Sequence, residues 1–228
     1  MYRYETHLHT APVSRCAVAN VFETVTFYKE AGYDGIFITN HFLDSNINID
    51  AAMPYEEKIA FYVSDYEEAA AIGKKIGIKV FFGVECSYEG TDFLVYGLDK
   101  AWYLGHPQIM DMDKRSQLRF FRENGGFVVQ AHPFREVPHI GYIRLYLDSV
   151  DGVEVVNANR TERENTMAML YAKTYDFIQT AGSDNHIGEK QVHLAGMEFE
   201  TPLCCEDDYI KRLKRGEGTI FTWTNQQP

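Results

Sequence analysis

Two histidines, His7 and His9, lie two positions apart in the stretch ETHLHT near the start of the chain. Side chains at positions i and i+2 of a strand point to the same face of the sheet, so the two imidazoles would lie side by side. Imidazole nitrogens are common metal ligands, and this arrangement suits a shared ion. A lone His-x-His pair is weak evidence, so the interpretation depends on what the other strands supply.

Other strand-like segments also end in metal-ligand side chains. The runs GIFITNH, VFFGVE and FVVQAH end in His41, Glu85 and His132, and FIQTAGSDNH ends in Asp184 and His186. Each run is apolar until its last residues. Histidine and carboxylate ligands with few thiols suit a catalytic Zn, Mn or Fe site better than a closed structural zinc site. The joint pattern therefore predicts a metal centre.

These side chains need a fold that brings strand ends together. Near-continuous apolar runs alternate with helical segments, which is typical of a parallel sheet covered on both faces. We expect strands over 2–9, 35–41, 78–85, 92–98, 127–132, 152–159 and 177–186, with helices over 21–31, 55–76, 113–124 and 161–174. About seven such strands favour a (β/α) barrel in one domain, 1–228, with the carboxyl ends of its strands meeting at one face.

Composition narrows the class of protein. The chain has 228 residues, with 22 Lys and Arg against 33 Asp and Glu, which gives a net charge of −11. A chain this acidic is a poor general binder of nucleic acid or anionic membranes. No secretory signal or membrane span is expected, and the four cysteines form no CxxC pair, so we expect reduced thiols and a cytoplasmic location. The oligomeric state cannot be read from the sequence.

The motifs HLHT, ITNH, GVE, AHP and GSDNH, in this order, resemble those of the PHP (polymerase and histidinol phosphatase) superfamily. The resemblance spans roughly residues 5–190. It implies a distorted (β/α)7 barrel that holds two or three divalent metal ions and hydrolyses phosphoesters. It also implies the ligand sets: His7, His9, Glu85 and Asp184 for one ion, Glu85 as a bridge to a second ion that His132 also holds, and His41 with His186 for a third.

Three positions depart from the family pattern. The family usually has Asp or His shortly after the His-x-His pair, where this chain has TAPVSRCA. Cys16 is the best candidate for that ligand, and a small buried packing residue is the alternative. The strand after the bridging Glu opens with Asp92 rather than His, and Asp92 is either an oxygen ligand of the second ion or no ligand. Asn40 stands where Asp is common, so it cannot serve as a charged acceptor for a ligand histidine.

The predicted chemistry is hydrolysis of a small phosphorylated metabolite or nucleotide by a metal-activated hydroxide. The predicted catalytic residues are His7, His9, Glu85 and Asp184. Among the basic residues near the ligands, which are Arg15, Arg135, Arg160 and Lys190, we favour Arg135 and Arg160 for binding the phosphate. No stable nucleic-acid or membrane partner is expected.

Two alternatives remain open. A metal-dependent amidohydrolase also begins with His-x-His, but that family usually has a carbamylated Lys after a middle strand, where this chain has Glu85. A non-catalytic regulatory module with a degenerate site is disfavoured by the nearly complete ligand set. Three histidines lie off the pattern: His139 and His193 are interpreted as surface or packing residues, and His106 is interpreted as such or as a further ligand.

Overall fold

The computed structural model describes residues 1–138 and 140–224. Within this part of the chain there are nine strands and six α-helices. The strands are β1 Tyr2–Glu5, β2 Gly35–Ile38, β3 Lys79–Tyr88, β4 Thr91–Tyr96, β5 Phe127–Ala131, β6 Gly152–Asn157, β7 Ile178–Gly182, β8 His193–Phe199 and β9 Thr219–Thr224. The helices are α1 Val21–Glu30, α2 Tyr55–Ile76, α3 Lys100–Gly105, α4 Lys114–Glu123, α5 Glu162–Thr174 and α6 Glu206–Lys214, with 3₁₀ turns η1 Pro107–Asp111 and η2 Gly188–Lys190.

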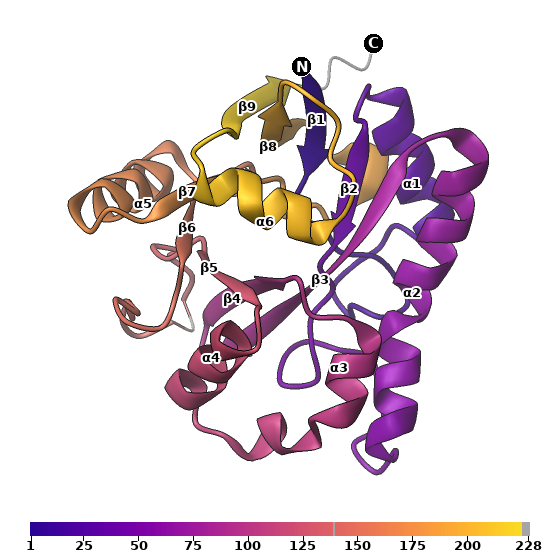
Figure 1. The fold of residues 1–228 in the computed structure, drawn as a ribbon, viewed down its shortest axis with the longest axis vertical. Helices are drawn as coiled ribbons and strands as arrows, with labels where there is room; N and C mark the ends of the chain where they lie inside the picture. The colour runs from indigo at the N-terminus through magenta and orange to yellow at the C-terminus, as the bar shows by residue number, and fades with distance from the viewer. Residues whose placement is uncertain (139, 225–228) are drawn as a thin grey trace.

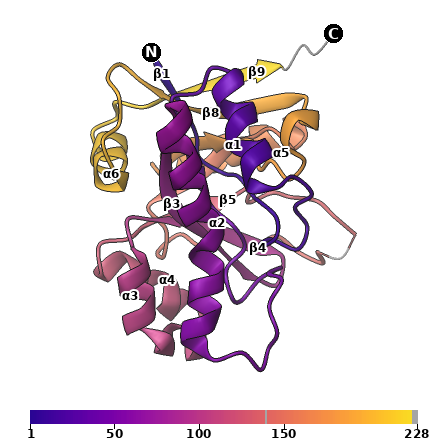
Figure 2. The same cartoon turned by 90° about the vertical axis from the view of Figure 1, so that its right-hand side faces the viewer.

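The strands form one sheet that is nearly closed into a barrel, in the order β7-β6-β5-β4-β3-β2-β1-β8-β9. Figure 1 shows α1 and α2 together on one side of this sheet and α5 on the opposite side. Figure 2, turned by 90°, shows α2 running along the strands with α3 beside its lower part. The predicted α/β class is therefore confirmed, although the structure does not establish a count of seven β/α units. No helix in the described ranges is long and apolar enough to cross a membrane.

The direction of β4 differs from the prediction of a parallel sheet. β1, β2 and β3 are parallel, as are β5, β6 and β7, but β4 is antiparallel to both of its neighbours. The reason is the connection from β3, which consists only of Glu89 and Gly90, with φ of 48° and 84°. Two consecutive positive φ values are typical of the tight turns in hairpins, and a parallel crossover needs a dozen residues or more. The antiparallel pair of β8 and β9, which are connected through α6, was also not predicted.

Strand ends at one edge of the barrel are joined by hydrogen bonds between distant segments. The backbone N–H of Asp184 donates to the carbonyl of His7 at 2.7 Å, and that of His9 donates to Asn185 at 2.9 Å. The Thr6 hydroxyl donates to the carbonyl of Ala181 at 2.6 Å. Gly182 permits this approach, because a Cβ at that position would overlap the Cβ of His7. The segments after β1 and after β7 therefore lie against each other.

Local sequence signals explain the helix limits. Asn20 and Glu23 form the predicted capping box of α1, which satisfies two backbone donors at its start. α2 spans the predicted 55–76 and ends at Gly77, which has φ of 79° and so adopts the left-handed conformation that glycine accepts readily. α4 matches the helix expected near 113–124. These helices fix the spacing between successive strand ends.

Aromatic side chains fill the barrel interior at the end opposite the ligand-bearing strand ends. Phe37 of β2 stacks on Phe81 of β3 with ring centroids 4.7 Å apart. The ring of Tyr209 in α6 contacts the rings of Phe37 and Tyr96, with centroid distances of 4.7 and 5.3 Å. Tyr96 also donates its hydroxyl hydrogen to the carbonyl of Thr6 at 2.7 Å. This buried layer supports the segment that carries His7 and His9.

Candidate metal centre

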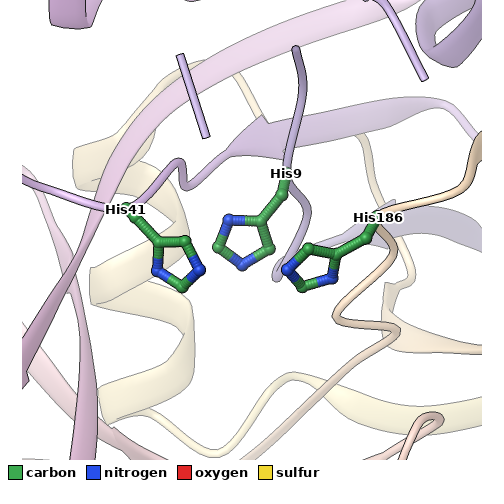
Figure 3. A group of neighbouring side chains, drawn as sticks. All are labelled: His9, His41 and His186. Carbon is green, nitrogen blue, oxygen red and sulfur yellow. The ribbon is translucent and has the colours of Figure 1, made fainter. Parts of the chain in front are cut away.

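The predicted strand-end ligands converge at one end of the barrel. Their nitrogen and oxygen atoms form three overlapping groups, in each of which all ligand atoms lie within 4.8 Å of one another. The groups are His7, Glu85 and His132; His7, His9 and Asp184; and His9, His41 and His186. Figure 3 shows the last group, with the three imidazoles side by side. All seven residues singled out at strand ends are therefore brought together.

Glu85 lies at the middle of this cluster and is 1% exposed. Its Oε1 atom is 3.1 Å from Nε2 of His7 and 3.6 Å from Nε2 of His132. Its Oε2 atom is 2.7 Å from Nδ1 of His41 and 3.3 Å from Nε2 of His9. One carboxylate thus faces ligand atoms of four histidines from three other segments of the chain.

His7 and His9 are buried and held by their Nδ1 atoms. Nδ1 of His7 donates to Oε1 of Glu154 at 2.8 Å. Nδ1 of His9 lies 3.2 Å from the hydroxyl of Ser14, which itself donates to Oδ1 of Asn40 at 2.9 Å. Both Nε2 atoms are consequently directed into the cluster, 3.2 Å apart. Partners of this kind fix the tautomer and the ring orientation of metal-binding histidines.

Glu154 is the main functional residue that sequence reasoning missed. Its Oε2 atom accepts hydrogen bonds from the backbone N–H of His132 at 3.0 Å and from Nδ2 of Asn157 at 2.9 Å. The pairing of β6 with β7 shifts register between Glu154 and Val156. This bulge re-aims the following residue, so Glu154 and Asn157 meet although they are three positions apart. The available signal was a charged residue inside an otherwise apolar strand.

Two ligand candidates have strained backbones. His132 has φ of 26° and Asp184 has φ of 52°, both in the region that residues with a Cβ rarely adopt. Such residues cost about 1–3 kcal/mol each and persist where the surrounding structure holds them. For Asp184 the support includes the hydrogen bond from its N–H to His7 and one from Asn157 Nδ2 to its Oδ2 at 3.3 Å. Strain at the ends of β5 and β7 is consistent with a functional site.

Cys16 and Asp92, the two uncertain candidates, both lie at the edge of the cluster. The Cys16 sulfur is 3.1 Å from Nε2 of His41, and the residue is exposed rather than buried. Oδ2 of Asp92 is 3.8 Å from Nε2 of His132, and its Oδ1 accepts a hydrogen bond from Ser87 at 2.6 Å. The interpretation of Cys16 as a buried packing residue is therefore wrong, and its place matches the expected neighbourhood of His41.

The predicted phosphate-binding arginines occupy different places. Nη1 of Arg135 is 3.2 Å from Oδ2 of Asp92, which places this guanidinium beside the ligand cluster. Arg160 instead lines a cavity between α5 and the paired strands β8 and β9, and none of the ligand candidates lines that cavity. Arg15 donates to the carbonyl of Ile47 at 2.9 Å. The structure thus brings Arg135, but not Arg160, to the ligands.

Of the histidines off the pattern, His106 and His193 contact residues outside the described ligand set. His106 stacks on Trp102 with ring centroids 4.3 Å apart, and its Nδ1 lies 2.7 Å from the carbonyl of that residue. His193 is exposed at the start of β8. His139 lies outside the described residues. Packing is therefore the interpretation that fits His106.

Neighbouring charges and burial shift the pKa values of the imidazoles in opposite directions. Burial alone would lower the pKa of His7, but the carboxylates of Glu154, Asp184 and Glu85 outweigh it and raise that pKa well above its usual value. Burial would lower the pKa of His41, but Glu85 and Cys16 together outweigh it and raise that pKa to about 10. His9 behaves oppositely: burial, and then the positive charges of its neighbours, lower its pKa well below the usual value.

The acidic groups are held in their charged forms. Burial raises the pKa of Glu85 and Asp184, but the surrounding histidines, His7 first, lower both well below their usual values. Burial likewise raises the pKa of the Cys16 thiol, but hydrogen bonds from His186 and His41 lower it to about 6. A thiolate and ionised carboxylates are the forms that bind metal ions.

The donor set fits divalent ions. Oε2 of Glu85 is buried and has no hydrogen-bond partner among the described residues, although His41 and His9 surround it. A buried carboxylate oxygen without a donor is costly unless a cation meets it. Imidazole, carboxylate and one thiolate together suit Zn, Mn or Fe, and the residues present could hold more than one ion.

Neither a protein-family model nor a curated protein matches the sequence, but solved structures match the fold. A two-domain protein from Bacteroides vulgatus, containing a predicted PHP-like metal-dependent phosphoesterase, matches with a TM-score of 0.70 and 13% identity over 96% of this chain. This chain spans 64% of that protein's length. An amidohydrolase from Chromobacterium violaceum matches with a TM-score of 0.57 and 14% identity, over 96% of this chain and 97% of its own.

A third structure, a candidate metal-dependent phosphoesterase from Bifidobacterium adolescentis, matches with a TM-score of 0.57 and 14% identity, over 93% of this chain and 96% of its own. The expected resemblance to PHP proteins is thereby confirmed at the level of the fold. The metal-ligand groups and the barrel end on which they lie are features of this chain itself.

Proposed function

We propose that this protein is a metal-dependent phosphoesterase that binds two or three divalent ions, Zn, Mn or Fe, at the barrel end described above. The observation that carries the proposal is the position of Glu85. Its Oε1 atom faces His7 and His132, its Oε2 atom faces His41 and His9, and no described residue makes a well-aligned hydrogen bond to Oε2. A carboxylate with its two oxygens directed at different imidazole groups is suited to bridging two cations.

The side chains divide naturally among the ions. One ion would take Nε2 of His7 and His9 with Asp184 and Glu85, and a second would take Glu85, His132 and, at the edge, Asp92. A third would take His41, His186 and the Cys16 thiolate. When bound, ions of this kind lower the pKa of a water molecule and neutralise charge on phosphoryl oxygens.

Other residues of the chain would orient a ligand and bind the phosphate. Glu154 keeps a proton on Nδ1 of His7, so that Nε2 remains a lone-pair donor. Arg135, beside Asp92, presents a planar guanidinium that can bind two phosphoryl oxygens at once. The substrate would be a small phosphorylated compound, because a chain with net charge −11 offers little to a long nucleic acid. Residues 1–228 would form a single catalytic domain.

Hydrolysis of a C–N bond is the second candidate, because one structure of the same fold is named an amidohydrolase. The middle-strand position where that family usually has a carbamylated lysine is Glu85 here. The guanidinium of Arg135 beside the ligands also suits a phosphate better than an uncharged amide.

The test combines metal content with a substrate panel. Metal-free protein is reloaded separately with Zn, Mn or Fe, and each form is assayed on phosphomonoesters and on amides. We expect more than one bound ion by elemental analysis and turnover of phosphomonoesters only. Glu85→Gln should lose metal and activity while its thermal unfolding stays close to wild type. Glu164→Gln is the matched control, because Glu164 is also largely buried but caps α5.

Each outcome is decisive. Protein that binds no ion when reloaded refutes the metal centre. Turnover of amides but not phosphomonoesters supports the second candidate instead. Wild-type metal content and rate in Glu85→Gln would show that this carboxylate is not a bridge.

A further inference from the structure

An aromatic and basic surface lies next to the proposed metal centre. It is formed where the β3–β4 turn meets the segment between β5 and β6. The approach is close, because a Cβ on Gly90 would lie 2.7 Å from the side chain of Ile140. Tyr142 and Arg144 line the same small cavity as His132 and Arg135. The surface therefore adjoins a predicted metal ligand and the predicted phosphate-binding residue.

Arg144 is fixed in place by the turn. Its Nη1 atom donates to the carbonyl of Glu89 at 2.9 Å, and its Nη2 atom pairs with the Glu89 carboxylate. Its guanidinium carbon lies 4.0 Å from the ring centroid of Tyr142 and 5.7 Å from that of Tyr88. The side chain is only 16% exposed. Arg144 thus acts as a support between two tyrosines rather than as a free charge.

Tyr142 is exposed to solvent, and the contact with Arg144 restrains its ring. The residue is 65% exposed, one of the highest values among the large apolar or aromatic side chains of the described residues. A cation over one face of the ring restricts its motion, and the exposure shows that much of the ring remains accessible. We call Tyr142 with its support Arg144 the Tyr142 platform. A rigid, open aromatic ring beside a cavity is a surface on which another flat ring can stack.

Arg135 connects the platform to the ligands. Its Nη1 atom pairs with Asp92, and its Nε atom is buried without a hydrogen-bond partner among the described residues. The same guanidinium lines both the small cavity shared with His132 and an adjoining open cavity of about 500 Å³ that Tyr142 also lines. An anionic group at Arg135 and a ring at Tyr142 could therefore belong to one small molecule.

We infer that the Tyr142 platform binds a planar aromatic ring in the organic part of the substrate, while Arg135 binds its phosphate. The inference rests on the proposed phosphoesterase function and names the substrate class: phosphate monoesters that carry a flat ring a few bonds from the phosphorus. A second phosphate is a poorer occupant of the platform, because both Nη atoms of Arg144 already contact Glu89, whereas Nε of Arg135 has no partner among the described residues.

The test compares two phosphate esters with the same leaving alkoxide. Adenosine 5′-monophosphate and ribose 5-phosphate differ only in the base, so their kcat/KM ratio reports ring binding. We expect the wild-type enzyme to prefer the nucleotide about tenfold or more, in line with base stacking on aromatic side chains. Tyr142→Leu should lower kcat/KM for the nucleotide far more than for ribose 5-phosphate and so remove most of that preference. Tyr142→Phe should keep the preference, as should the control Tyr175→Leu, which alters a tyrosine 52% exposed near α5.

The other outcomes separate this inference from the proposed function. An unchanged ratio in Tyr142→Leu overturns the platform and leaves the phosphoesterase intact. If neither ester is hydrolysed, saturation-transfer NMR with adenosine and with ribose tests the platform directly. A signal from adenosine that Tyr142→Leu abolishes supports it, and no such signal overturns it. Self-association of the wild type that Tyr142→Leu abolishes would instead make the surface a contact between copies and overturn the inference.

Discussion

Replacing Glu154 by glutamine should weaken metal binding without unfolding the barrel. The carboxylate accepts hydrogen bonds from Nδ1 of His7, the backbone N–H of His132 and Nδ2 of Asn157. A glutamine has one carbonyl oxygen, so its amide must meet one of these donors. If the oxygen keeps the two donors at Oε2, the amide faces His7 and moves the imidazole proton from Nδ1 to Nε2. That proton then lies on the atom that should bind the ion.

The hydrogen bonds of Glu154 indicate how much metal affinity the variant should lose. Losing one hydrogen bond to a charged group costs about 1.5–3 kcal/mol. Loss of a residue that orients a metal ligand typically lowers metal affinity about 10–100-fold, or about 1.4–2.7 kcal/mol. The two ranges overlap, so we expect a loss of that size. Because Glu154 also raises the pKa of His7, the variant suffers less proton competition, and the loss should be larger at high pH than at low pH.

The assay is a competition titration of metal-free protein against a chelator of known affinity, at two pH values. Circular dichroism and thermal unfolding establish that the variant is folded. Glu164→Gln, which alters a largely buried carboxylate at the start of α5, should titrate like wild type. An affinity for Glu154→Gln equal to wild type would refute the idea that Glu154 sets the His7 tautomer.

The remaining predictions concern the thiol and the barrel closure. With its pKa lowered to about 6, Cys16 should react with iodoacetamide at pH 7 in metal-free protein, more slowly below pH 6, and hardly at all after zinc loading. Mass spectrometry should find Cys204, whose pKa is raised, slower at pH 7 and unaffected by zinc. Gly182→Ala should displace His7 and lower both metal content and melting temperature; unchanged metal content would contradict the closure described here.

Much of the centre was readable from the sequence because its ligands stand at strand ends. His41, His132 and Asp184 each interrupt an apolar run, and the carboxyl ends of parallel strands meet at one edge whatever the details of packing. The capping box of α1 and the glycine after α2 were readable for a similar reason, since both depend on local hydrogen bonds and φ values. Features that depend only on residues close in the chain, such as helix caps, could therefore be predicted from the sequence.

Glu154 and the direction of β4 needed information that local patterns do not carry. Whether a carboxylate inside a strand faces solvent or His7 depends on a bulge in its pairing with β7, which forms only when the sheet does. The turn at Glu89 and Gly90 did carry a signal, because no helix fits between β3 and β4. The apolar strands favoured a parallel sheet, and the short turn was not used to predict the direction of β4. The separation of Arg160 from Arg135 likewise depends on where α5 packs.

The contact between the segments after β1 and after β7 bears on how the protein is made. The hydrogen bond from Ser183 N–H to Glu5 spans 178 positions in the chain. At about 5–20 residues per second, synthesis would leave the first strand without this partner for on the order of ten seconds or more. His7 and His9 would emerge from the ribosome long before Asp184, so a nascent chain has only part of the proposed ligand set. Metal loading would then wait for the later segment, and a captured ion would tie two segments that are made at very different times.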